Sequence, residues 1–305
     1  MKQILSQTKS QNNKKRTIIK LIAFLAVLML VVGCHREEGT ATVRVHLSGF
    51  TVEQEEFPEL RSAVDPASYN PVTAVMLAFY DIEGTEVYKT TQYKNNGSTY
   101  TTFGSFTANL PVGTYTMVAL GYAYNDGDVF TLTSPTEAAF TSERPREMFC
   151  ATQSVMVTSG TSLDLNVTLS RIVSALKILS TDGRPASATK VRTTYAKGGK
   201  SFNPTTGLAL TDNGFTQTNN PSSAVGATIQ VTSFPFLYTD EETMDITIEV
   251  LDANNNLLFT HTVNDVPFKR NRMTTLQGDI FTANPSGAGF QLETDWLTPL
   301  NPINF

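Results

Sequence analysis

The sequence predicts an all-β protein, built as two β-sandwiches in tandem behind an N-terminal export signal. Three observations lead to this fold class. Short segments of alternating apolar and polar residues recur after residue 39, turn signals rich in Gly, Asn, Asp and Pro separate them, and no segment has a long amphipathic helical stripe. Many short strands at such spacing favour sandwiches.

The first 33 residues have the three zones of a secretory signal. Residues 1–20 carry six basic residues and no acid, and the run from Leu21 to Gly33 is entirely apolar. As a helix this run would rise about 20 Å, which is short against a hydrocarbon core of about 30 Å. We therefore expect residues 1–33 to be a cleaved signal peptide and not a permanent span.

The junction that follows predicts a lipoprotein. The run Leu30-Val31-Val32-Gly33-Cys34 fits a lipobox, in which the cysteine thiol is alkylated and cleavage leaves Cys34 as the new N-terminus. Residues 34–39 would then be a tether between a membrane, which the lipid enters, and the folded protein. The alternative is an ordinary signal peptide with a chance cysteine. Apart from the covalent lipid we expect no cofactor and no metal.

Charge and cysteine content limit the function. Removal of the signal lowers Lys and Arg from 23 to 17 against 28 Asp and Glu, for a formal charge of −11. Such a charge disfavours nucleic acid as a partner. Cys34 and Cys150 are the only cysteines, so lipid on Cys34 leaves no disulfide within the chain. Cys150 lies in an apolar context and is expected to be a buried core residue.

The predicted strands divide the chain near Leu169–Arg171. Alternating strands are predicted at 42–47, 163–169, 245–250 and 290–296, and denser apolar runs at 75–80, 115–122 and 228–238 are expected to be central strands. The stretch from Leu165 to Ile178 would close a first domain (residues 40–169) and open a second (residues 170–305). A single large sandwich is the alternative.

Motifs of enzyme chemistry are missing from the sequence. His35, His46 and His261 are the only histidines, and the chain has no HExxH, CxxC, GxSxG or phosphate-binding glycine loop. We therefore expect no catalytic residues, although a Ser-His-Asp arrangement is defined by geometry and can be formed by residues far apart in sequence.

Four segments resemble the fimbrillin family of Bacteroides-type bacteria, the subunits of type V pili. They are Gly39–Val45, the strand 74–80 with Asp81 and Gly84, the segment Leu169-Ser170-Arg171-Ile172-Val173-Ser174-Ala175, and Val266–Arg272 followed by 276–280 and a terminal strand with Trp296. The resemblance implies two tandem sandwiches of the transthyretin-like, Greek-key type. It also implies assembly with other fimbrial subunits by strand exchange.

In that family a subunit reaches the surface as a lipoprotein, and a trypsin-like protease then cuts after an arginine beyond the first strand. The matching candidate is Arg61, before Ser62, in a polar and acidic segment that is expected to be accessible. Loss of the first strand, at 40–48, would uncover the partners of Val43, Val45 and Leu47 and leave two strand edges unpaired. The alternative is an uncut surface arginine.

The terminal strand is the candidate donor for another subunit. Phe290, Leu292 and Trp296 share one face of this predicted strand, in the same alternation as the first strand. Alternatively, it is the last strand of its own domain.

The resemblance implies a non-enzymatic stalk or anchor subunit of an adhesive fimbria on the outer membrane. A stalk subunit would be processed into the fimbrium, whereas an anchor would keep both lipid and first strand. Two other classes stay open, a glycan-binding surface lipoprotein and, more remotely, a surface hydrolase.

Overall fold

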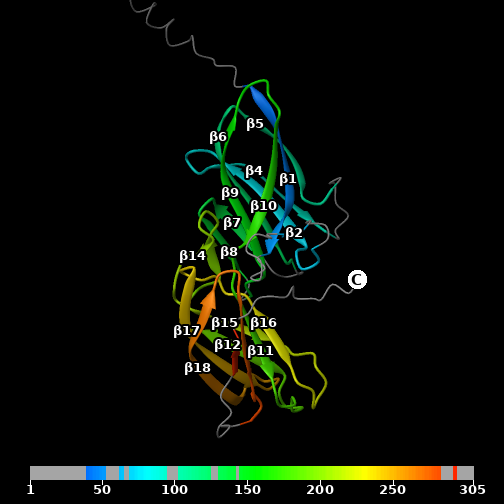
Figure 1. Cartoon of the computed structure of the whole chain (residues 1–305), viewed down its shortest axis with the longest axis vertical. Coiled ribbons are helices and arrows are strands. Elements are labelled where there is room, and N and C mark those ends of the chain that lie inside the picture. The colour runs from blue at the N-terminus through cyan, green and yellow to red at the C-terminus, as the bar shows by residue number, and fades with distance from the viewer. Residues whose placement is uncertain are drawn as a thin grey trace, which may run out of the picture. The chain divides into compact units, whose positions relative to one another are not determined.

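The computed structural model describes residues 39–52, 62–64, 69–94, 102–124, 130–141, 144–282 and 291–293, of which 51–52, 62–64 and 291–293 are described as backbone alone. All regular elements in these residues are β-strands (Figure 1). The all-β class predicted from the sequence is confirmed, and the sheets pack as sandwiches. In these residues no helix could span a membrane.

The first part of the chain forms one eight-stranded sheet that folds over on itself. Four strands in the order β4-β3-β6-β9 face the group β5-β1-β10, and β2 pairs with the end of β1. The two layers meet where Ser170 and Arg171 of β10 pair with Cys150 and Phe149 of β9. The strands are β1 (Thr40–Val52), β2 (Ser62–Val64), β3 (Ala74–Tyr80), β4 (Glu86–Tyr93), β5 (Ser105–Pro111), β6 (Gly113–Tyr122), β9 (Met148–Val157) and β10 (Leu163–Arg171).

Strands β3 and β6 are buried on both faces. Leu77 points into the core between the layers, and its neighbour Ala78 points into a second core on the opposite face. A strand buried on both faces has no polar face, so it appears in the sequence as a continuous apolar run. The central strands predicted at 75–80 and 115–122 are thereby confirmed.

The second part of the chain contains two four-stranded sheets around a separate core. One has the order β16-β11-β19-β20 and the other β15-β12-β17-β18. Their bounds are β11 (Ala175–Ser180), β12 (Lys190–Tyr195), β15 (Phe215–Asn219), β16 (Gln230–Ser233), β17 (Glu241–Leu251), β18 (Leu257–Lys269), β19 (Met273–Gly278) and β20 (Gln291–Glu293).

The central strand predicted at 228–238 is wrong. In its place, β16 covers four residues and lies at the edge of its sheet. Pro235 follows shortly after, and proline cannot donate to a sheet ladder, which confines such a segment to an edge or a bend.

The two parts of the chain repeat one pairing pattern. In the first, β1 pairs in parallel with β10 and also pairs with β5; in the second, β11 pairs in parallel with β19 and also with β16. The facing layers agree as well, since β4-β3-β6-β9 corresponds to β15-β12-β17-β18 in order and direction. Strand β11 therefore occupies in the second part the place that β1 occupies in the first.

A small sheet and a third core connect the two parts. The sheet has the order β14-β13-β8-β7, with β7 (Phe130–Ser134) and β8 (Glu137–Phe140) from the first part and β13 (Ser201–Asn203) and β14 (Leu208–Ala209) from the second. Side chains from both parts, such as Tyr80 and Phe236, share the third core. The division at 169/170 into two domains stays a prediction.

Candidate functional site: the first strand and its groove

Strand β1 lies between two partner strands in the face of the sandwich. It runs parallel to β10, with Val43 opposite Leu163 and Leu47 opposite Val167 (Figure 1). On its other side it pairs with β5, and the Leu47 amide donates to the Gly104 carbonyl over 2.9 Å. Withdrawal of β1 would therefore leave unpaired backbone on both flanking strands.

The inner face of β1 is part of the core. The side chains of Val43, Val45 and Leu47 are 0%, 1% and 1% exposed, among core residues from both layers. Burial of each such side chain contributes about 1.5–3 kcal/mol relative to an exposed one. Core residues of both layers therefore line an apolar groove, and these three side chains of the same chain fill it.

The outer face of β1 carries polar side chains that bond alternately to the two flanking strands. Thr42 donates to Asn109 of β5 (3.0 Å), and His46 lies 2.9 Å from Ser105. The 42–109 and 46–105 pairs establish that β1 and β5 are antiparallel. On the β10 side, Arg44 lies 3.5 Å from Asp164 and Ser48 lies 3.0 Å from Thr168. These contacts are exposed to solvent, so they add little to stability.

The far end of β1 carries an aromatic residue that the sequence analysis did not single out. A bulge between Leu47 and Gly49 shifts the register, and it makes Phe50 the next inward residue, opposite Leu169. The Phe50 ring is fully buried, with centroids 4.8 Å from Phe149 and 5.7 Å from Tyr69. The expected strand 40–48 is thus longer in the structure and includes a further core residue.

Behind these rings lies a buried ion pair. The guanidinium of Arg171 is 2.6 Å from the Glu147 carboxylate, with both side chains at most 3% exposed. Tyr69 donates to the same carboxylate over 2.8 Å, and Arg171 donates to the Tyr69 oxygen over 2.9 Å. Burial and the Glu147 charge raise the pKa of Tyr69, so its hydroxyl stays a donor. Arg171 also lies over the Phe149 ring and donates to Asn271.

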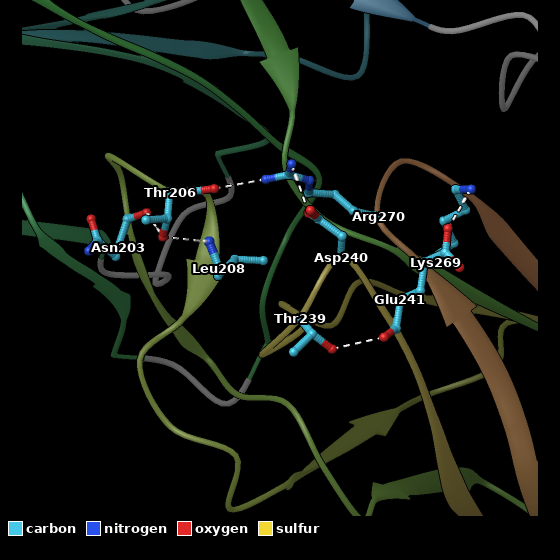
Figure 2. Close-up of polar contacts among 8 residues, drawn as sticks. All are labelled: Asn203, Thr206, Leu208, Thr239, Asp240, Glu241, Lys269 and Arg270. Carbon is cyan, nitrogen blue, oxygen red and sulfur yellow. Dashed lines mark hydrogen bonds and ion pairs between the residues drawn. The ribbon is translucent and has the colours of Figure 1, made fainter.

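A polar hollow of about 550 Å³ adjoins Arg171, between β9, β10 and turns of the second part of the chain. Figure 2 shows its wall, where Arg270 donates to the Thr206 carbonyl and pairs with Asp240, both over 2.8 Å. Lys269 pairs with Glu241 over 2.6 Å. The charged side chains of this wall are paired with one another within the chain. Such pairing is more typical of a structural contact between strands than of a ligand-binding site.

Comparison with protein families decides where the chain belongs. Residues 38–297 match a family described as being of unknown function, DUF6562. The chain belongs to this family. No curated protein matches it.

Solved structures share the fold of this DUF6562 protein. A candidate polysaccharide-binding protein of Bacteroides thetaiotaomicron aligns over 83% of this chain and 95% of its own, with 13% identity and a TM-score of 0.50. A candidate adhesin of Bacteroides ovatus aligns over 86% and 97%, with 11% identity and a TM-score of 0.50. The fimbrial anchor protein Mfa2 of Porphyromonas gingivalis aligns over 84% and 97%, with 12% identity and a TM-score of 0.48. The fold is consistent with the fimbrillin resemblance of the sequence.

Several predicted site residues of the DUF6562 protein lie outside the described residues, namely Cys34, Arg61, Phe290 and Trp296. Ser62 begins β2, whose backbone pairs with Val52 at the end of β1. Leu292 lies in β20, the edge strand that pairs with β19 of the same chain. Processing at Arg61 and strand donation by 290–296 stay predictions.

Cys150 is a buried core residue, as expected. Burial raises the pKa of its thiol to about 12, and the thiol lies 3.3 Å from the Pro204 carbonyl. Among the described residues, no three His, Cys, Asp or Glu side chains gather as a metal ion would require.

Proposed function

We propose that this protein is a non-enzymatic structural subunit of an adhesive surface fimbria, assembled by exchange of its first strand. After export, β1 would be withdrawn and a strand of another subunit would take its place. Support comes from the fimbrillin-like sequence segments and from a fold held in common with a candidate adhesin.

The single observation that carries the proposal is the position of β1. It is the first of the described strands, is buried on its inner face and is paired on both edges. Its removal would open a slot between β5 and β10 and leave the order β10-β9-β6-β3-β4 intact. A free edge beside an apolar groove is a template for an added strand. Strands inside the fold, such as β11, cannot leave in this way because the chain continues at both of their ends.

Lipid on Cys34 would hold the precursor at the outer membrane, and a cut after Arg61 would release the subunit from it. Palmitate should label the exported chain and should fail to label a Cys34→Ser variant. An anchor subunit would keep its lipid in the mature fimbria, whereas a stalk subunit would lose it.

Limited trypsin digestion of purified residues 35–305 tests the proposal. We expect one early cut after Arg61, followed by ladders on native gels and fibres in electron micrographs. The Arg61→Gln variant is the matched control and should remain uncut and monomeric. Cutting at Arg61 without formation of any oligomer would exclude a role as a stalk subunit.

A glycan-binding role has weaker support. One structural neighbour is described as a candidate polysaccharide-binding protein. In the described part of the chain, however, Tyr238 is the only aromatic among the exposed large apolar side chains, and Tyr93 packs against the Tyr124 ring. Calorimetric titration with surface glycans distinguishes the two functions, because a structural subunit should give no binding heat.

A further inference from the structure

We propose that the cavity now filled by Phe50 selects the strand that replaces β1, and that the indole of Trp296 from a second copy of this chain fills it. This inference rests on the proposed function, because it concerns the same groove. It adds the side chain that an incoming strand must carry and the register in which it must lie.

The cavity is shaped for a ring by a missing side chain. A Cβ on Gly121 of β6 would lie 2.6 Å from Cε1 of Phe50 and 3.3 Å from Cδ1 of Leu169. Gly121 does not have a positive φ, so its backbone would accept alanine. Gly121 therefore leaves room for the ring, because the side chain of any larger residue would clash with it.

The walls of the cavity do not depend on β1. Phe149 and Tyr69 line it, with their centroids 5.6 Å apart in an edge-to-face arrangement. Arg171 lies 5.0 Å from the centroid of Phe149 and donates to the Tyr69 oxygen, so both rings are fixed from behind. Rings in such a setting favour another aromatic side chain over an aliphatic one.

The register on β10 relates this cavity to the C-terminal segment. The inward residues of β1 lie opposite Leu163, Leu165, Val167 and Leu169, and the bulge makes the last of them Phe50. A regular strand without a bulge would meet the same four positions with every second residue. Beginning at Phe290, those residues are Phe290, Leu292, Thr294 and Trp296, so Trp296 would take the place of Phe50.

The outward residues of the segment are compatible with this register. Gln291 would take the place of Arg44 opposite Asp164, which avoids two like charges on directly paired positions. Donation would require β20 to leave β19, to which it is bound as a three-residue edge strand.

A peptide exchange experiment tests the assignment. The host is the chain 35–305 with a specific protease site inserted between Val52 and Ser62, and with Trp296→Phe so that the host has no tryptophan. After cleavage and removal of β1 in mild urea, fluorescent peptides 288–298 and 39–52 are added, and binding is followed by anisotropy. We expect both to bind, with a blue-shifted Trp296 emission in the first.

Substitutions that change side-chain size on either side of the contact test the contribution of the cavity to binding. Trp296→Ala in the peptide should weaken binding by about tenfold or more. Gly121→Ala in the host should weaken binding of the wild-type peptide by a similar factor. It should leave binding of the Trp296→Ala peptide unchanged, because that peptide has no ring to clash with the added methyl group. Phe50→Ala in the 39–52 peptide should behave like Trp296→Ala.

Each contrary outcome has a distinct meaning. Binding of 39–52 without binding of 288–298 overturns the Trp296 assignment and leaves strand exchange intact. Binding of both peptides without an effect of Trp296→Ala or Gly121→Ala overturns the role of the cavity. If neither peptide binds, the proposed function fails and this inference fails with it.

Discussion

At the scale of single residues, the groove combines two kinds of position. Val45 is a core residue on a strand, and its neighbour His46 points outward to Ser105. This alternation was visible in the sequence because period two follows from strand geometry. Phe50 was not foreseen, because the bulge at Ser48 and Gly49 breaks the alternation that sequence analysis relies on.

Val45→Asp should strongly destabilise the uncut chain. The substitution places a carboxylate in the core without a partner, and we expect a loss of about 3 kcal/mol or more in the free energy of unfolding. Urea denaturation measures it, with His46→Asp on the exposed face as the control, which should cost about 0.5 kcal/mol or less. An unchanged midpoint for Val45→Asp would mean that the first strand is not buried.

At the scale of elements, the all-β class and two of the three predicted central strands followed from the sequence, whereas the third central strand and the pairing of strands did not. The run Val75 to Tyr80 identified β3 because both of its faces are buried. In contrast, no local pattern indicated that β1 lies between β5 and β10, because contacts between strands that are distant in sequence leave no such pattern. The short sheet of β7, β8, β13 and β14 was missed for the same reason.

Removal of β1 should open only the first part of the chain. In a chain cut between Val52 and Ser62 and stripped of β1, amides of β5 and β10 that faced β1 should lose protection from hydrogen exchange. Amides of β11, β16 and β19 should keep theirs, because their strand ladder is unchanged. Mass spectrometry of exchanged peptides measures both sets, and equal loss in the two would indicate global unfolding instead.

At the scale of the whole molecule, Arg171 links what the sequence analysis treated as two domains. It binds Glu147 and Tyr69 of the first part and Asn271 of the second. Two of the four segments that carry the fimbrillin resemblance, 169–175 and 266–272, thus meet at this residue. Both segments were recognised in the sequence, but their contact with each other was not predicted. Glu147 was not predicted either, because it belongs to no motif in the sequence.

Arg171→Met should cost about 3–5 kcal/mol in the free energy of unfolding, because it leaves the Glu147 carboxylate buried without its cation. The control is Arg192→Met, which breaks a comparable pair with Glu249 where the side chains are 36% and 19% exposed. That change should cost about 1 kcal/mol or less. Equal losses in chemical denaturation would contradict a special role for the buried pair.

The repeated pairing pattern has one consequence for architecture. If subunits assemble by exchange of β1, each molecule would offer one acceptor site although its topology contains two equivalent positions, because β11 follows directly from β10 and cannot be withdrawn. A filament that grows through one acceptor groove per subunit would be unbranched and polar, because all subunits would point in the same direction along it.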